Sequence, residues 1–327
     1  MRPWVAYAGA VVLPLVGWIA AIPAFKSAEK YELNDKARAA EYGSYVPLED
    51  GKVRYELIGR DTAHTVVLVH GFSVPSYVWG PTFRDLSEAG FRVLRFDMFG
   101  RGFSDRPRER YDRDFYVHHI GELLDSLRIT RPVTLVGLSM GGAVVAAYAA
   151  EHPDRVRDVV LIDPTTRPRA IGAMRIPLIG GWIARTFWLP ELAQSQIGDF
   201  YDTDRFYYWQ ELYEEQMMFK GFGRALLSTM RHFSSKDPTP DYDALANLDK
   251  PVLLIWGEHD RTVPVQEAGP LRQRLGAELF IVPNAGHLPH YEQPRIVSPK
   301  IVEFLGRKER AQRTQSVVLQ GRRRGRR

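Results

Sequence analysis

The feature that most constrains the fold is a series of short, mostly apolar segments, each followed by a polar turn and most by a helical pattern. These segments lie at residues 65–69, 91–96, 133–136, 156–162, 251–256 and 278–282. Apolar residues on both faces of a strand indicate that both faces are buried, and alternation with helices indicates parallel strands joined by crossovers. The sequence therefore predicts an α/β fold, a mostly parallel sheet with helices on both faces.

The alternation of strands and helices is interrupted once, over residues 165–240. This segment has no strand-like run and is rich in aromatic residues. We expect it to be a helical cap inserted into a core that comprises residues 44–164 and 241–306. The core should begin with a hairpin of strands 44–48 and 52–58, because Asp50-Gly51 supplies a turn.

The N-terminal segment, residues 1–25, is apolar and carries no charge after Arg2. Its last 22 residues would span about 33 Å as a helix, which matches a hydrocarbon core of about 30 Å. We therefore expect a single N-terminal membrane helix and a membrane-anchored protein, with a linker over residues 26–43. A cleaved signal peptide, which would give a secreted or periplasmic protein, is the alternative.

The C-terminal segment, residues 307–327, holds nine basic residues and one acidic residue. Without this tail the net charge of +5 becomes −3, so the body of the protein is mildly acidic. We expect a disordered, solvated tail, with contact to anionic lipid headgroups as its functional alternative. Nucleic acid is not an expected partner, since the tail has no interleaved aromatic residues.

A serine stands in an unusual turn at residues 137–141, which read Gly-Leu-Ser-Met-Gly between a predicted strand and a predicted helix. The pattern G-x-S-x-G in this context is typical of a sharp turn that exposes a nucleophile at the end of a sheet. The N-terminus of the following helix also favours developing negative charge. We predict that Ser139 is a nucleophile.

A serine nucleophile needs a base, and the base needs an acid that orients it. His287 follows the last predicted strand and is the predicted base, with His290 as the alternative. Asp260 follows the penultimate strand and is the predicted acid, with Asp163 and Glu258 as alternatives. Cysteine is absent, which excludes a thiol nucleophile, a thiolate metal site and disulfides.

Two further features surround these residues. Acyl transfer requires donors for an oxyanion, and the backbone N–H groups of Phe72 and Met140 are the candidates.

Residues 97–105, Asp-Met-Phe-Gly-Arg-Gly-Phe-Ser-Asp, are interpreted as a structural turn in which Arg101 pairs with a nearby carboxylate.

With these residues in place, the sequence resembles the α/β-hydrolase superfamily from about residue 44 to residue 306. The motifs that carry the resemblance stand in family order: His70-Gly71-Phe72, Asp97-Met98-Phe99-Gly100-Arg101-Gly102-Phe103-Ser104, Gly137-Leu138-Ser139-Met140-Gly141-Gly142, Gly257-Glu258-His259-Asp260 and Gly286-His287. The resemblance implies a triad of Ser139, Asp260 and His287 under a helical cap, and implies no metal and no organic cofactor.

Within this superfamily, dehalogenases and epoxide hydrolases use an aspartate nucleophile, which Ser139 argues against. The strand-end motifs look closest to those of the carbon–carbon bond hydrolases, but two positions depart from their pattern. What remains looks like a serine esterase or monoacylglycerol-type lipase, so the expected function is hydrolysis of carboxylic esters with apolar, lipid-like acyl chains. The alternative is a carbon–carbon bond hydrolase of ring meta-cleavage products. Those enzymes typically carry Asn before the serine and Trp after the histidine, where this chain has Leu138 and Leu288. A non-catalytic binding protein of the same fold is the third hypothesis.

Overall fold

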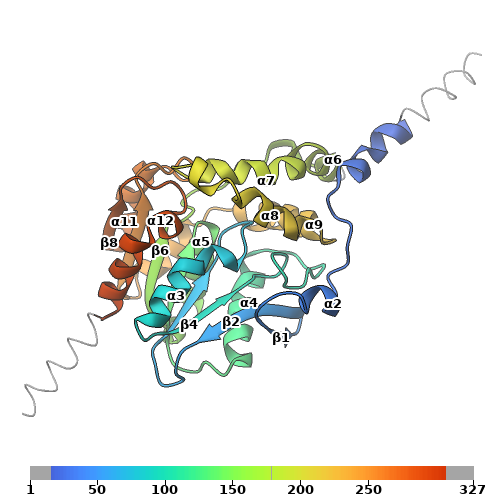
Figure 1. Ribbon diagram of the computed structural model, residues 1–327. Helices are drawn as coiled ribbons and strands as arrows, with labels where there is room; N and C mark the ends of the chain where they lie inside the picture. Colours follow the sequence, from blue (N-terminus) through green and yellow to red (C-terminus); the bar gives the residue numbers. More distant parts are fainter. Residues whose placement is uncertain (1–15, 178, 307–327) are drawn as a thin grey trace, which may run out of the picture.

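The computed structural model describes residues 16–177 and 179–306 (Figure 1). The described residues form one eight-stranded sheet in the order β1-β2-β4-β3-β5-β6-β7-β8. The strands are β1 (Ser44–Leu48), β2 (Gly51–Ile58), β3 (Thr65–Val69), β4 (Arg92–Phe96), β5 (Val133–Leu138), β6 (Val156–Ile162), β7 (Val252–Gly257) and β8 (Glu278–Val282). β2 is antiparallel to β1 and to β4, and the remaining neighbours are parallel. The prediction of an α/β fold with a mostly parallel sheet and an N-terminal hairpin is confirmed.

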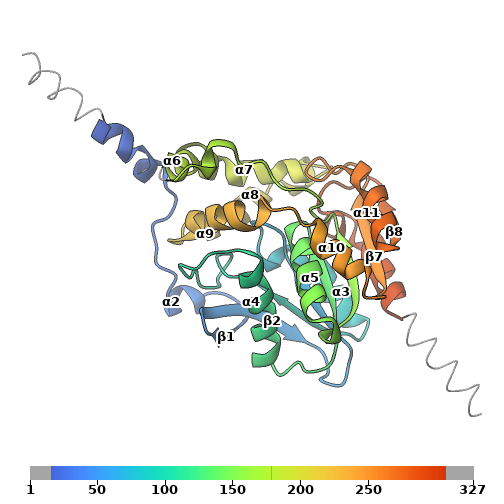
Figure 2. The same ribbon diagram turned by 180° about the vertical axis from the view of Figure 1, so that it is seen from behind.

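Helices cover both faces of the sheet, as Figures 1 and 2 show from opposite sides. On one face lie α3 (Gly80–Glu88), α12 (Pro289–Glu292) and a last helix over residues 294–306; on the other lie α4 (Arg113–Ser126), α5 (Met140–Glu151), α10 (Thr239–Ala246) and α11 (Ala268–Leu275). β3 explains why both faces need cover. Val66 and Leu68 belong to one buried cluster, and Val67 and Val69 to the other. Alternate residues of a strand point to opposite faces, so a strand that is apolar throughout must be buried on both.

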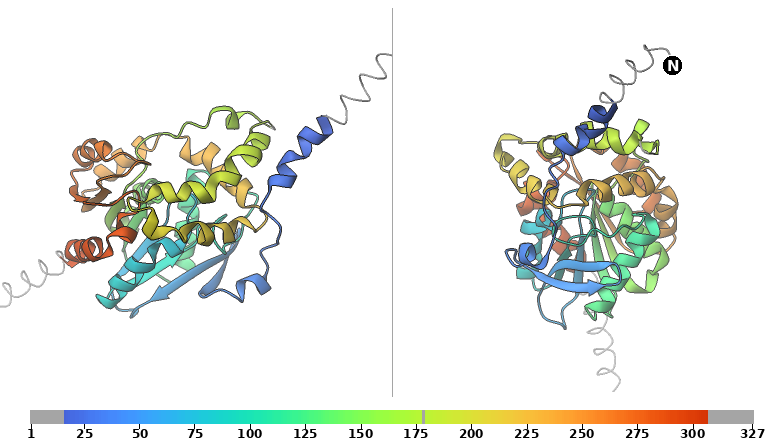
Figure 3. Two further views of the ribbon diagram at one scale, coloured as in Figure 1. Left: turned by 45° about the horizontal axis from the view of Figure 1, so that its top comes forward. Right: turned by 90° about the vertical axis from the view of Figure 1, so that its right-hand side faces the viewer.

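The segment between β6 and β7 is helical and lies over one edge of the sheet (Figure 3). Its elements are η3 (Gly172–Arg175), α6 (Ile179–Ile183), η4 (Ala184–Trp188), η5 (Leu189–Glu191), α7 (Leu192–Ser195), η6 (Gln196–Asp199), η7 (Asp204–Phe206), α8 (Trp209–Met217), α9 (Phe222–Thr229) and η8 (Met230–Ser234). Short helical turns elsewhere are α2 (Asp35–Arg38), η1 (Ser76–Trp79), η2 (Pro153–Arg155) and η9 (Val265–Glu267). Many aromatic residues of the segment between β6 and β7, among them Phe200, Trp209 and Tyr213, pack against one another or into the core of that segment. We refer to residues 165–240 as the cap, keeping the predicted boundaries.

The prediction of a membrane helix in residues 1–25 is wrong. In the part of the chain that the structure describes, no helix has both the length and the apolar character needed to cross a bilayer. The described end of this segment is helical over residues 16–26. It lies beside the cap, where Trp182 Nε1 donates to the carbonyl of Ile19 at 2.9 Å. The membrane localisation and membrane contact inferred from this segment are corrected with it. Residues 1–15 and the basic tail, residues 307–327, lie outside the described residues, and lipid contact by the tail stays a prediction.

Candidate active site

Ser139 occupies the turn between β5 and α5. Its backbone has φ 53° and ψ −120°, a region that residues other than glycine rarely adopt and that costs free energy. The flanking glycines leave no room for a side chain. A Cβ on Gly137 would lie 2.4 Å from the carbonyl oxygen of Gly141, and a Cβ on Gly141 would lie 2.4 Å from the carbonyl oxygens of Val69 and His70. The turn therefore needs both glycines, and it sets Ser139 at the wall of a cavity.

His287 and Asp260 meet at the same edge of the sheet. His287 Nδ1 donates to Asp260 Oδ2 at 2.8 Å, and both side chains are buried. The other carboxylate oxygen of Asp260 accepts the N–H groups of Thr262 and Val263 at 2.7 and 2.9 Å. Burial acts to lower the pKa of His287, but the negative charge and the hydrogen bond of Asp260 outweigh it and leave this pKa raised. The ring is thus held with Nδ1 protonated, which leaves Nε2 as its basic atom.

Asp163, the alternative acid, lies beside this pair rather than in place of Asp260. Carboxylate oxygens of Asp163 and Asp260 and a ring nitrogen of His287 all lie within 4.8 Å of one another. Asp163 Oδ1 accepts the N–H of Gly257 at 2.8 Å, whereas Oδ2 is buried without a donor. Burial, and then the charge of Asp260, raise the pKa of Asp163 well above its ordinary value. A proton on Asp163 accounts for the unpaired oxygen, because Oδ2–H can then donate to Asp260.

The same three groups have the spacing of metal ligands. A metal would require both carboxyls to be deprotonated and the Nδ1–Asp260 hydrogen bond to be broken. The hydrogen-bonded arrangement fits proton transfer better than metal binding.

The other two sequence alternatives lie away from this pair. His290 is buried against Trp79, with ring centroids 4.5 Å apart, and burial lowers its pKa to about 3. Glu258 is exposed and lies 3.6 Å from His259. Neither side chain contacts His287.

Phe72 and Met140, the predicted oxyanion donors, line a cavity together with Ser139. Met140 is the first residue of α5, and the first N–H groups of a helix have no partner within it. Phe72 follows β3, in a loop braced by His70. His70 Nε2 accepts the N–H of Met98 at 2.9 Å, and Nδ1 lies 2.9 Å from the carbonyl of Gly71. Burial lowers the pKa of His70 to about 4, so its neutral ring acts as both donor and acceptor near neutral pH.

Arg101 also braces this loop, and the prediction that it pairs with a carboxylate is wrong. Its fully buried guanidinium donates to the carbonyl of Phe72 at 2.9 Å and to the hydroxyls of Tyr116 and Thr229 at 2.8 and 2.9 Å. Thr229 belongs to the cap, so one side chain joins the cap, the sheet edge and the loop that carries a candidate oxyanion donor.

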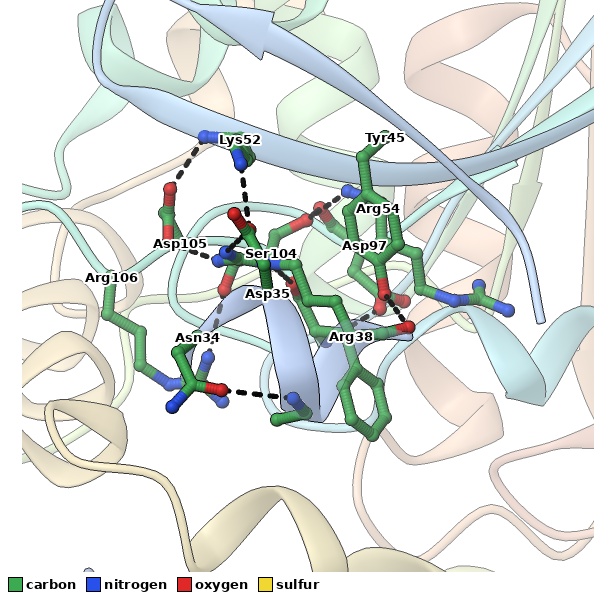
Figure 4. Close-up of polar contacts among 12 residues, drawn as sticks. Asn34, Asp35, Arg38, Tyr45, Lys52, Arg54, Asp97, Ser104, Asp105 and Arg106 are labelled. Atoms are coloured by element: carbon green, nitrogen blue, oxygen red, sulfur yellow. Dashed lines mark hydrogen bonds and ion pairs between the residues drawn. The ribbon is translucent and has the colours of Figure 1, made fainter. Parts of the chain in front are cut away.

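The loop of residues 97–105 has the structural role that its glycines indicated, and Figure 4 shows its polar contacts. Asp97 accepts the N–H of Phe103 at 3.0 Å, and the Ser104 hydroxyl donates to the Asp97 carbonyl at 2.6 Å. Asp105 accepts the N–H of Lys52 at 2.7 Å and forms an ion pair with Arg38. These bonds tie the loop to β2 and to the segment that precedes the sheet.

Ser139 and His287 line one cavity of about 380 Å³ between the sheet edge and the cap. Its apolar wall includes Phe72, Phe187, Trp188, Leu192 and Leu288. Phe187 and Trp188 are aromatic residues of the cap. The cavity can therefore hold an apolar group next to Ser139.

Sequence reasoning missed three charged residues of the site. The carbonyl of Asp199 in the cap accepts the N–H of His287 at 2.7 Å, and its carboxylate accepts the Thr262 hydroxyl at 2.6 Å. Glu292 accepts the N–H of Gly286 at 2.6 Å. Arg169 lines the cavity and stacks over the Phe72 ring, 5.9 Å from its centroid. No strand-end position or short motif marks these residues, so the sequence carried no signal for them.

Comparison with known proteins gives consistent matches over the body of the chain. A family model described as alpha/beta hydrolase fold matches residues 64–294. A 2-hydroxy-6-oxo-2,4-heptadienoate hydrolase of Pseudomonas putida is 30% identical over 272 residues, which cover 78% of this chain and 94% of the relative.

Two solved structures superpose over most of their length. The enol-lactonase from Burkholderia xenovorans has a TM-score of 0.70 at 25% identity and covers 80% of this chain and 99% of its own. A thermophilic esterase from Thermogutta terrifontis has a TM-score of 0.69 at 25% identity. The match covers 80% of this chain and 98% of the esterase.

Proposed function

This chain is a hydrolase of the alpha/beta-hydrolase family, and from that premise we propose that it cleaves carboxylic esters with an apolar acyl chain through Ser139. The observation that carries the proposal is the cavity in which Ser139 and His287 share a wall with Phe187, Trp188 and other apolar side chains. The hydrogen bond between His287 and Asp260 supports it, because a serine needs an oriented base.

In the proposed reaction, Ser139 Oγ forms a bond to the ester carbonyl carbon while its proton passes to His287 Nε2. The carbonyl electron pair moves to oxygen, where the N–H groups of Phe72 and Met140 stabilise the negative charge. Collapse of this intermediate breaks the bond to the alcohol oxygen, which takes the proton from His287 and leaves an acyl-serine. A water then repeats the sequence, giving its proton to His287, and releases the acid and free Ser139.

The test is hydrolysis of p-nitrophenyl esters from acetate to palmitate by the full chain. We expect activity to peak at a medium or long acyl chain and Ser139→Ala to lower kcat/KM at least about a thousandfold. Ser87→Ala, at a half-buried serine on α3 that does not line the cavity, is the matched control and should retain activity. Hydrolysis that persists in Ser139→Ala would contradict the assignment of the nucleophile.

The second candidate is hydrolysis of a carbon–carbon bond in a ring meta-cleavage product. The Pseudomonas putida relative, named a 2-hydroxy-6-oxo-2,4-heptadienoate hydrolase, supports it. Leu138 and Leu288 argue against it, since both line the cavity where the resembling enzymes typically carry Asn and Trp. If no ester is cleaved, loss of the absorbance of a ring-cleavage dienoate on addition of the protein would favour this candidate.

A further inference from the structure

The space around Ser139 has two lobes of different chemistry. The first is the cavity of about 380 Å³ whose apolar wall contains Phe187 and Trp188 and whose acidic residues are Glu191 and Asp199. The second, of about 460 Å³, lies between the segment after β6 and the loop after β7. Phe72, Ser139 and Arg169 line both lobes, so a molecule bound at Ser139 can reach into each.

The second lobe is lined by three arginines and one acidic residue. Arg167 forms an ion pair with Glu267 at 3.2 Å. Arg169 and Arg261 are exposed, and neither forms an ion pair with another described residue. The lining of the lobe therefore carries more basic than acidic side chains. Its remaining polar side chains include the hydroxyl groups of Thr165 and Thr166.

Arg169 is held at the junction of the two lobes. Its backbone N–H donates to the carbonyl of Ser234 at 2.7 Å, and its guanidinium lies over the Phe72 ring. The charge of Arg169 acts on Asp199 in the cap and on His287. In both cases its positive charge acts to lower the pKa of the other side chain. A guanidinium this close to the reacting groups can contact a bound substrate.

We infer that the preferred substrates are esters with an apolar arm and an anionic arm, the anion being a carboxylate or a phosphate bound by Arg169 and Arg261. This inference rests on the proposed ester hydrolysis. The apolar arm lies against Phe187 and Trp188, and the guanidinium groups bind the oxyanion by charge-assisted hydrogen bonds.

Two pairs of matched substrates test it. Mono-4-nitrophenyl adipate and its methyl ester differ by a carboxylate on the acyl side. 4-(Hexanoyloxy)benzoate and its methyl ester differ by a carboxylate on the alcohol side. We expect kcat/KM about tenfold higher for the anionic member of one pair, mainly through KM and decreasing with added salt, because exposed charges are screened. The pair that shows the preference identifies the anionic arm.

Arg169→Gln and Arg261→Gln should each lower the anionic-to-neutral ratio of kcat/KM toward one. Arg175→Gln removes the same charge from an exposed cap arginine outside both lobes and should leave the ratio unchanged. If Arg169→Gln does not fold, Arg261→Gln and the salt dependence of the unmodified protein still decide the matter. Equal kcat/KM for both members of both pairs would overturn this inference and leave ester hydrolysis standing. No Ser139-dependent cleavage of any of the four esters would overturn both.

Discussion

At the scale of single residues, the least expected feature is a pair of buried carboxyls beside one histidine. Asp163 follows β6 and Asp260 follows β7, and parallel strands bring both to one edge of the sheet. Two carboxylates this close cannot both ionise without a large electrostatic cost. The buried, donor-free Oδ2 of Asp163 indicates which of them keeps the proton.

This arrangement predicts a specific pH dependence of stability for Asp163→Asn. Burial and the charge of Asp260 raise the pKa of Asp163 well above its ordinary value, so we expect the folded protein to keep this proton at pH values where the unfolded chain releases it, above about pH 4. This residue therefore contributes stability that is complete at low pH and is lost as the pH rises toward its folded-state pKa. Relative to the unmodified protein, Asp163→Asn should gain about 1.4 kcal/mol in the free energy of unfolding per pH unit over that range.

Urea unfolding of both proteins at a series of pH values from 5 to 8 measures the difference. The Asn side chain keeps an N–H donor toward Asp260, so the fold should tolerate it. A difference between the two proteins that does not change with pH would mean that Asp163 is ionised in the folded state.

Ser139, Asp260 and His287 could be located from sequence because each directly follows a strand with a visible apolar run. Asp199, Glu292 and Arg169 could not, because they reach the site through contacts between the cap and the core. Such contacts depend on how two separate segments pack, and no local pattern encodes them. Their roles in catalysis, like those of the first three, are open to the tests proposed above.

At the scale of elements, strands were easier to predict than the ends of the chain. A strand buried on both faces leaves a continuous apolar run, and residues 159–162 and 252–256 show it plainly. The apolar run at the N-terminus was long and apolar enough to predict a membrane helix. Hydropathy does not reveal that residues 16–26 contact the cap, where Trp182 donates to the carbonyl of Ile19.

The element that ties the cap to the sheet edge is the loop around Arg101, and Arg101→Lys should weaken it. Lysine has three donors on a flexible stem and cannot reproduce the planar set of bonds to Phe72, Tyr116 and Thr229. We expect a loss of about 2–4 kcal/mol in the free energy of unfolding. Because Arg101 also braces the loop after β3 that carries the Phe72 amide, we also expect kcat to fall about tenfold with little change in KM.

Thermal unfolding and steady-state kinetics on one p-nitrophenyl ester measure both effects. Arg108→Lys, an exposed arginine of the segment that follows, serves as the control and should resemble the unmodified protein. Unchanged kcat in a destabilised Arg101→Lys would show that the loop position does not matter for the reaction.

At the scale of the whole molecule, the cap and the core meet at the backbone of the His287 loop. The Asp199 carbonyl accepts the His287 N–H, and Glu292 links both segments by accepting N–H groups of Gly286 and Tyr201. The position of the cap and that of the candidate base are therefore coupled. A change that pushes the cap away should also disturb His287.

Gly286→Ala makes this change with a single methyl group. Its Cβ would lie 2.4 Å from the carbonyl oxygen of Asp199 and 2.8 Å from the backbone nitrogen of Tyr201, so one backbone must move. We expect a loss of about 1–3 kcal/mol in the free energy of unfolding together with a lower kcat/KM. Gly269→Ala is the matched control: a Cβ there meets nothing within 4 Å, and the substitution should stabilise the protein by about 0.4–1 kcal/mol. Urea unfolding and ester hydrolysis of both variants check the expectation, and a Gly286→Ala protein as stable and active as the unmodified one would mean that the cap does not hold the His287 loop.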